Sequence, residues 1–365
     1  MKRNLKDLWL YGKEMVILGL LVCFLLGPVT QAQSSKDAPV YQITPVLSKI
    51  TFFVKSSISL EGTFKKWDAS LTFTSTEPFF IWWNTTRMHI WTHLKPASQG
   101  VTGLGIYPDG MVEHDGQVGE LLKKLEDLGI ADNTIVMYST DNGAEAMSWP
   151  DGGTTVFRGE KNTNWEGGYR VPCFIRWPGV IKPGMIINDI GSHEDMFPTL
   201  LAAAGDTTAK EDLLKGKKVG DVTFKVHVDG YNLLPAFKGG VEWPRHEFLY
   251  WTDDGNVAAL RYNQWKITFL RQDAHSMAVW QEPFVELRAP IIANLRSDPF
   301  ERGQYEGIDY GRWFIDHAFV FAPAATYIGQ WLQSFREFPP SQKPGSFNLN
   351  RVMEAVTSGA IVGNN

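Results

Sequence analysis

The chain has 365 residues, of which 44% are hydrophobic and 13% aromatic, so it can bury a sizeable core in two or three domain-sized pieces. Its formal net charge of -5 provides no overall basic field, and no local basic patch stands out, so we expect no nucleic-acid partner.

The first 32 residues have the pattern of an export signal peptide. Basic residues precede an apolar run at residues 15–29, and small side chains follow at residues 30–32, at the spacing that a signal peptidase recognises. The run is shorter than the ~20 apolar residues of a full span, so we expect cleavage after Ala32 and no stable membrane span afterwards; an uncleaved anchor is the alternative. The mature chain would be periplasmic or extracellular, with Cys173 as its one cysteine and no internal disulfide.

Residues 33–76 combine a short polar linker with a β-strand pattern. Apolar and polar side chains alternate through "KITFFVKSSISLEGTFKKWDASLTF", which predicts two or three antiparallel strands. In "SKITFFVKSS" and "GTFKKWDASLTF" this stretch resembles the opening of the YceI-like family, periplasmic lipocalin-like barrels that hold polyisoprenoid lipids. A barrel that encloses a ligand needs about eight strands, so we do not expect this segment to bind lipid alone.

The next segments alternate between apolar strands and an amphipathic helix. "PFFIWW", at residues 78–83, is a continuous apolar run, typical of a strand buried on both faces. Residues 114–128 carry apolar side chains at helical spacing, Gly129 ends that pattern, and residues 134–138 form a short β-rich run. A helix that leads into such a strand is half of a parallel βαβ unit, in which functional groups gather at the carboxyl ends of the strands.

Asp141 and Asn142 follow directly after this predicted strand, in "STDNGAE". They lie where an α/β sheet places a functional site, but an Asn-Gly pair also makes simple turns, so both interpretations are open. Lys161 comes next, in the loop "FRGEKNTNWEGGYRVP". It could be an ordinary solvated lysine, whereas the neighbouring glycines would allow a ligand to approach closely, and an ammonium group suits an oxyanion.

Six sequence blocks then occur in the order in which the arylsulfatases of the sulfatase family have them, so residues 77 to about 353 resemble that family. The blocks are "NTIVMYSTDNGAE", "FRGEKNTNWEGGYRVP", "SHEDMFPTLLAAAGD", "HVDGYNLLPAF", "ALRYNQWKITF" and "NLRSDPFERG". The resemblance implies an α/β fold of the alkaline phosphatase-like type, a mixed sheet flanked by helices and incomplete at its amino-terminal side. It also implies a core at residues 77–240 and a carboxyl-terminal subdomain with a small antiparallel sheet at residues 241–365.

The activity that this resemblance implies is sulfuric ester hydrolysis, in which a formylglycine hydrate attacks sulfur beside a Ca²⁺ ion. The substrate would be a small sulfate ester or a sulfated glycan. Asp141 and Asn142 match the family's late pair of metal ligands, and their oxygens suit a hard cation such as Ca²⁺. Lys161 matches the lysine that grips the sulfate. In "FFIWWNTTRMHIWTHLKP", counting from the paired phenylalanines places His89 at the family's sulfate-contacting histidine.

Other polar residues of the matched blocks are expected to be structural. His193 and Asp195 precede an apolar helix in "SHEDMFPTLLAAAG", where they would cap its start. Arg296, Asp298 and Arg302 would tie down a carboxyl-terminal strand.

The sequence departs from the family at the reacting group. Formylglycine is made from the first residue of a Cys/Ser-x-Pro/Ala-x-Arg motif, and no such motif occurs here. The first metal carboxylates and the nucleophile would all precede residue 78. We therefore expect an arylsulfatase-type protein that is inactive as this chain, binds Ca²⁺ weakly and tends to self-associate through an exposed sheet edge.

Two alternatives stay open. One is an active phospho- or sulfo-esterase of the same superfamily, completed by another chain or using Ser139 or Thr140 as its nucleophile. The other is an exported, non-enzymatic binding protein built on the barrel-like segment.

Overall fold

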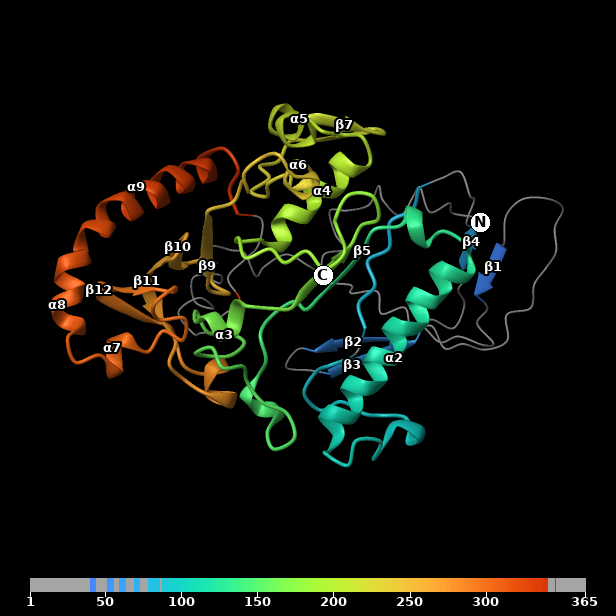
Figure 1. Cartoon of the computed structure of the whole chain (residues 1–365), viewed down its shortest axis with the longest axis horizontal. Coiled ribbons are helices and arrows are strands. Elements are labelled where there is room, and N and C mark those ends of the chain that lie inside the picture. Colours follow the sequence, from blue (N-terminus) through green and yellow to red (C-terminus); the bar gives the residue numbers. More distant parts are fainter. Residues whose placement is uncertain are drawn as a thin grey trace, which may run out of the picture. The chain divides into compact units, whose positions relative to one another are not determined.

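The computed structural model describes residues 78–85 and 87–340, residue 345, and the backbone of four short strands within residues 40–72. The predicted signal peptide, with its cleavage site at Ala32, lies outside the described residues. The described residues fall into two compact units, one ending at His114 and the other beginning at Asp115. Figure 1 labels their helices and strands.

The first unit contains two antiparallel strand pairs. Strand β1 (Val40–Ile43) pairs with β4 (Ala69–Thr72), and β2 (Thr51–Lys55) pairs with β3 (Ser59–Thr63). The antiparallel pairing predicted from alternation is thus present, but with four strands in two separate two-stranded sheets rather than the two or three strands predicted.

The apolar run at residues 78–83 is not a strand, contrary to the prediction. Its backbone is irregular, and the side chains of Phe80, Ile81 and Trp82 are 72%, 59% and 80% exposed. A continuous apolar run indicates burial only if the fold supplies a covering surface on both sides. Among the described residues no strand pairs with this segment, so the run is an exposed apolar surface, and self-association through such surface stays a prediction.

The predicted amphipathic helix is present as α2 (Ile106–Asp127), within which the division between the two units falls. It begins eight residues before the predicted start at His114. Asp109 is buried in its first turn and accepts bonds from the backbone and hydroxyl of Thr102 at 2.8 and 2.7 Å. The helix ends before Gly129, as predicted, because the φ of +66° at that residue is left-handed and favours glycine.

Strand β5 (Val136–Ser139) follows the helix and pairs antiparallel with β6 (Cys173–Arg176). The predicted parallel βαβ unit is not found among the described residues, because α2 precedes β5 as expected but residues 78–83 form no strand that could pair with it. The chain between β5 and β6 is a long loop with the short helices η3 (Ala146–Ser148) and α3 (Glu166–Tyr169) rather than a helical crossover. Without a crossover helix, the returning strand runs antiparallel.

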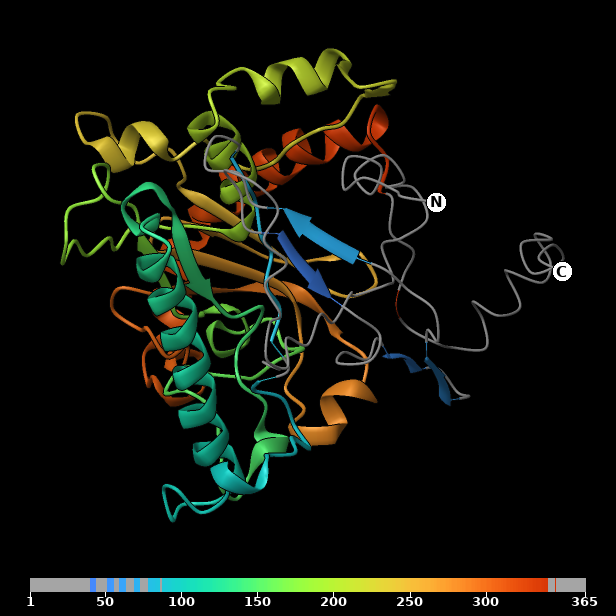
Figure 2. The same ribbon diagram turned by 90° about the vertical axis from the view of Figure 1, so that its right-hand side faces the viewer.

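A helical layer follows β6 in the second unit. Helices α4 (Met196–Ala203), α5 (Ala209–Lys215) and α6 (Leu234–Lys238) lie close together, with the hairpin of β7 (Lys217–Val219) and β8 (Val222–Phe224) beside α5 (Figures 1 and 2). Short 3-10 segments complete this part: η2 (Ala131–Asn133) before β5 and η4 (His193–Asp195) before α4.

The carboxyl-terminal part is a four-stranded antiparallel sheet in the order β12-β11-β10-β9, so the predicted small antiparallel sheet is confirmed. Its strands are β9 (Glu247–Trp251), β10 (Val257–Tyr262), β11 (Trp265–Arg271) and β12 (Val285–Asn294). The helices around it are η5 (Ser276–Trp280), α7 (Gly303–Glu306), α8 (Tyr310–His317), η6 (Ala318–Val320), α9 (Phe321–Leu332) and η7 (Gln333–Arg336).

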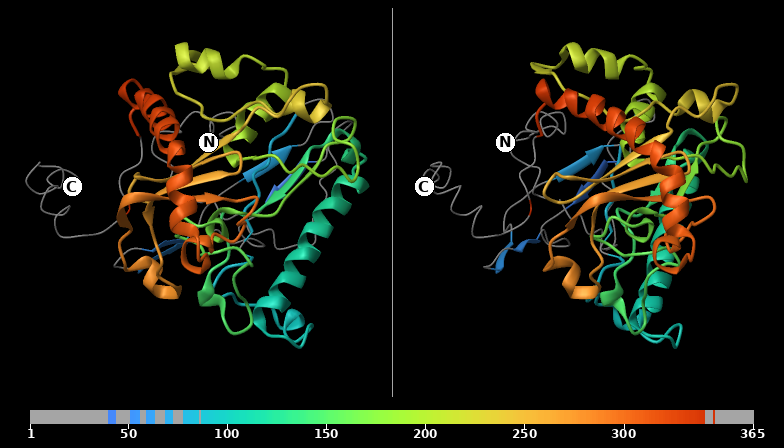
Figure 3. Two further views of the ribbon diagram at one scale, coloured as in Figure 1. Left: turned by 60° about the vertical axis from the view of Figure 1, so that its left-hand side comes forward. Right: turned by 90° about the vertical axis from the view of Figure 1, so that its left-hand side faces the viewer.

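Alternate residues of this sheet face two different neighbours, as the two-residue period of a strand requires. Leu249, Leu260 and Ile267 pack against Val320 and Ala324, so α8 and α9 cover one face (Figure 3). The opposite face carries Tyr250, Ala259 and Lys266, which pack toward the loop between β5 and β6. That loop carries Lys161, so the sheet serves as its support.

Candidate functional site

The loop after β5 presents the oxygens that the sequence predicted. Asp141 is exposed, and no hydrogen bond or ion pair engages its carboxylate within the described part of the chain. The Asn142 side chain donates to the carbonyl of Gly143 at 2.8 Å, which leaves its own amide oxygen free to accept. Both residues lie at the end of a strand, and both offer oxygen ligands.

This loop packs directly on the loop that carries Lys161. The Gly143 amide donates to the Gly168 carbonyl at 2.9 Å, and the Lys161 amide donates to the Ala144 carbonyl at 3.0 Å. A Cβ at Gly143 would lie 1.8 Å from the Gly167 carbonyl oxygen, so only glycine fits there. The structure thus brings the backbones of Asp141, Asn142 and Lys161 together.

Glu160 holds the Asp141 loop and the Lys161 loop together. Its carboxylate, 1% exposed, accepts from the Ala146 amide at 2.7 Å and from the Ser276 amide at 3.0 Å. One buried side chain therefore links the Asp141 loop, the Lys161 loop and helix η5. The Lys161 ammonium, which follows Glu160 in sequence, points toward Trp280, with 5.7 Å between Nζ and the ring centroid.

A buried ionic cluster anchors the other end of the Lys161 loop to the sheet. Lys266 is fully buried, and its Nζ lies 3.1 Å from Glu166, 2.8 Å from Glu301 and 2.8 Å from the Asn164 carbonyl. Burial alone would raise the pKa of Glu166, but the charges of Lys266, Arg261 and Arg170 and a hydrogen bond from a tyrosine lower it to about 2. The carboxylate therefore stays ionised inside the protein.

The pKa of Glu301 moves in the opposite direction. Burial and the negative charge of Glu166 raise it, and the charge of Lys266 only partly offsets this. Glu166 and Glu301 share the ammonium group of Lys266. Glu166 has the lower pKa because two arginines also compensate its charge.

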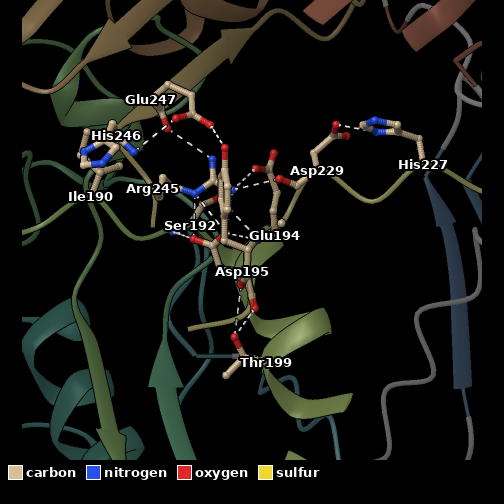
Figure 4. A network of polar contacts seen from close by, with 12 residues as sticks. Ile190, Ser192, Glu194, Asp195, Thr199, His227, Asp229, Arg245, His246 and Glu247 are labelled. Atoms are coloured by element: carbon tan, nitrogen blue, oxygen red, sulfur yellow. Dashed lines mark hydrogen bonds and ion pairs between the residues drawn. The ribbon is translucent and has the colours of Figure 1, made fainter. Parts of the chain in front are cut away.

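Asp195 is structural, as predicted. Ser192 and Asp195 form a capping box at the start of the helical segment, and the fully buried Asp195 carboxylate also pairs with both Nε and Nη2 of Arg245 (Figure 4). The Tyr231 amide donates to the same carboxylate at 2.7 Å. This network holds α4 to the chain before β9.

His193 makes a contact that sequence reasoning did not find. Its Nε2 lies 2.9 Å from Oγ of Ser139, the last residue of β5. That hydroxyl also lies 3.0 Å from the Pro172 carbonyl and 3.2 Å from the Thr140 carbonyl, and it has one proton to donate. A histidine 54 residues away has no local signal that would pair it with this serine.

His89 lies in the first compact unit. Its ring is exposed, and its Nδ1 lies 3.3 Å from the carbonyl of the next residue, Ile90. Its predicted role as a sulfate contact stays a prediction.

Calcium would find the right type of ligand at Asp141 and Asn142 but too few of them. The ion takes six to eight oxygens, and these two residues supply two or three. Among the residues that the structure describes, no group of three or more His, Cys, Asp or Glu could hold a metal ion. Asp141 and Asn142 alone are therefore too few to hold the ion, and their role as metal ligands stays a prediction.

Cys173 does not resemble a formylglycine precursor. It lies in β6, directly opposite Ser139, and is followed by Phe-Ile-Arg. Although the residue is partly exposed, packing around its sulfur raises the pKa of the thiol.

A cavity of about 330 Å³ lies beside the loop that carries Lys161. It is lined by Arg158, Trp165, Gln272, His275 and Tyr305 among others. The Arg158 guanidinium stacks on the Trp165 ring at 3.5 Å and pairs with Asp273 at 2.9 Å. Because this charge is already matched, the cavity is a weaker place for an anion than the surroundings of Lys161.

The comparisons with known proteins agree with the resemblance to sulfatases. A family model described as "Sulfatase" matches residues 30–206. The chain is similar to the steryl-sulfatase of Mus musculus (33% identity, 51% of this chain and 28% of that protein) and to the N-acetylgalactosamine-6-sulfatase of Homo sapiens (31%, 62% and 44%). Arylsulfatase A of Bos taurus is 28% identical over 73% of this chain and 51% of that protein.

The fold comparison gives the same result. The chain resembles the crystal structure of a sulfatase from Pseudoalteromonas sp. with a TM-score of 0.56 and 25% identity, over 70% of this chain and 48% of that one. A second structure, connected by its title with glycosaminoglycan metabolism in Bacteroides thetaiotaomicron, gives a TM-score of 0.53 at 24% identity.

The sulfatase match begins at residue 30 and so includes residues 41–76. The resemblance of this segment to YceI-like barrels is not supported by the comparisons. The chain spans about a quarter to a half of the length of the relatives named above. Over that shared part it has the family's α/β fold. Residues 30–206 therefore carry a sulfatase-family sequence, and the chain spans part of the length of its sulfatase relatives.

Proposed function

We propose that this chain is an exported sulfatase-family protein that binds sulfate esters at Lys161 but does not hydrolyse them. The observation that carries the proposal is the double packing of the Lys161 loop, on the Asp141 loop through Gly143 and on η5 through Glu160. A rigid loop that presents an ammonium beside free carboxylate and amide oxygens is suited to an anionic ester and a cation.

The proposed lack of turnover rests on the sequence. No Cys/Ser-x-Pro/Ala-x-Arg motif occurs in the 365 residues, so a formylglycine-generating enzyme has no residue to convert. Loss of a covalent nucleophile removes most of the rate, while residues that hold the substrate can still bind it. Ligand classes would be small sulfate esters or sulfated glycans, because the relatives' names include both steryl and sugar sulfatases.

Export is the remaining part of the proposal and rests on the amino-terminal pattern. Among the residues that the structure describes, no helix is long and apolar enough to cross a membrane.

The test is turnover of 4-nitrophenyl sulfate by the mature chain, with Ca²⁺ supplied and after co-expression with a formylglycine-generating enzyme. We expect no rate above background. If the parent chain turns over the substrate and the double variant Lys161→Ala/His89→Ala does not, the site is active and the proposal is wrong.

One observation favours a second candidate, an active esterase that uses Ser139. The 2.9 Å contact with His193 has the geometry of a nucleophile and its base, provided that the hydroxyl proton points at Nε2 rather than at the Pro172 carbonyl. Turnover of 4-nitrophenyl phosphate or sulfate that disappears in Ser139→Ala and in His193→Ala, but persists in Ser148→Ala, would establish this candidate in place of the first.

A further inference from the structure

Trp280 is a large aromatic side chain at the candidate site that no part of the proposed chemistry uses. It is the last residue of η5, its side chain is 45% exposed, and its ring centroid lies 5.7 Å from Nζ of Lys161. Exposed tryptophans next to a charged group are common at binding surfaces, because the ring offers apolar area at small entropic cost.

The position of Trp280 is fixed by buried contacts. The residue before it, Val279, is 2% exposed, and its carbonyl accepts a 2.6 Å bond from the side chain of Asn162, the neighbour of Lys161. At the start of the same helix, the Ser276 amide bonds to Glu160. Lys161 thus lies between two residues that both bind η5, so the backbone of Lys161 and the helix that carries Trp280 are held together.

The distances define what can lie between them. A sulfate oxygen that pairs with an ammonium lies about 2.8 Å from the nitrogen. The alcohol carbon of the ester is bonded to another oxygen of the same sulfate, so the alcohol part begins within a few ångströms of Nζ. A ring attached there reaches the surface of a side chain whose centroid is 5.7 Å from the ammonium.

We propose that Trp280 is a stacking platform for the alcohol part of the ester, so that the site prefers sulfates carried on a ring, aromatic or pyranose, over those carried on an open alkyl chain. This inference rests on the proposed binding of sulfate at Lys161. A linear chain presents a narrow edge to the indole, whereas a flat ring covers it and removes apolar area from water on both sides.

The test is a ligand-observed NMR titration of the mature chain with four probes: inorganic sulfate, propyl sulfate, 4-nitrophenyl sulfate and glucose 6-sulfate. We expect at least one ring sulfate to bind about tenfold more tightly than propyl sulfate. The two ring probes separate the aromatic from the sugar class. Trp280→Ala should remove the preference for ring sulfates and leave the affinity for inorganic and propyl sulfate within about twofold of the parent. Trp280→Phe should keep most of the preference for ring sulfates.

Trp149 provides the matched control. It is 78% exposed, it lies in the same unit, and Trp149→Ala should leave all four affinities unchanged. Lys161→Ala should weaken every probe. If the parent binds inorganic sulfate but ring and propyl sulfates equally, the platform is refuted and the proposed function stands. If the parent binds none of the four probes, both are refuted. Equal weakening of all probes by Trp280→Ala would also overturn the inference, because it would show a structural role.

Discussion

Replacement of Lys266 by methionine tests the buried cluster that supports the Lys161 loop. Lys266, Glu166 and Glu301 are 0%, 1% and 2% exposed in their side chains, so solvent cannot replace the lost charge. Methionine has nearly the same length as lysine and keeps the packing volume. The variant therefore isolates the effect of leaving two carboxylates without their shared cation.

The expected loss is about 3–5 kcal/mol in the free energy of unfolding at neutral pH, the cost of breaking a buried pair by removal of one partner. Glu166 keeps Arg170, whose Nε lies 2.6 Å away. Within the described part of the chain, the Glu301 carboxylate keeps the bond from the Glu166 amide but no cation, so most of the loss should arise there. The control is Lys225→Met, which removes an exposed ion pair with Glu337 and should cost at most about 1 kcal/mol.

Glu166 and Glu301 make the free energy of unfolding depend on pH in opposite directions. Glu166 has a pKa of about 2 in the folded protein against an ordinary 4.5, so it contributes up to about 3 kcal/mol of stability above pH 5, which is lost as pH falls toward 2. Glu301 has a raised pKa, so its contribution is present below its ordinary pKa and is lost as pH rises. In Lys266→Met both pKa values rise, and we expect a smaller deficit at pH 5 than at pH 8.

The assay is urea unfolding followed by tryptophan fluorescence at both pH values. Equal stability of parent and Lys266→Met at pH 8, or a deficit that grows at pH 5, would refute the reasoning.

Three further predictions concern single contacts. Asp195→Ala should lower the free energy of unfolding by about 3–5 kcal/mol, because it removes the buried partner of Arg245 and leaves the arginine with the more exposed Glu194, whereas Ser192→Ala should cost only about 1 kcal/mol; urea unfolding distinguishes them. Gly143→Ala should lower the melting temperature and weaken sulfate binding together, since its Cβ would meet the Gly167 carbonyl at 1.8 Å; an unchanged affinity would contradict this. Calorimetry should show Ca²⁺ binding no tighter than millimolar, and micromolar binding abolished by Asp141→Ala would mean that further ligands complete the shell.

Local signals in the sequence predicted the elements that depend on local interactions. The end of α2 at Gly129 follows from the left-handed backbone that this position needs, and the cap at Ser192 and Asp195 follows from hydrogen bonds over three residues. The carboxyl-terminal sheet was expected from the family resemblance instead, and its strands carry consecutive buried residues because both faces of the sheet are covered.

The failures concern features that depend on distant partners. Residues 78–83 were predicted as a buried strand on hydrophobicity alone, but hydrophobicity does not specify the covering surface, and the segment is exposed. The pairing of β5 with β6 depends on the shape of the loop between them. Glu166 and Lys266 are 100 residues apart, and neither residue has a neighbour in sequence that would predict a buried ion pair.

The same cluster explains why Lys161 is available to a ligand. A lysine on a loop with two nearby glutamates would ordinarily pair with one of them and lose its value as an anion site. Here Glu160 is committed to two backbone amides and Glu166 to Lys266 and Arg170, and both carboxylates are buried. Within the described residues, the Lys161 ammonium contacts the uncharged ring of Trp280. Because both glutamates of the loop are committed to buried contacts, no carboxylate of the described residues pairs with Lys161. Its positive charge therefore remains available at the candidate site.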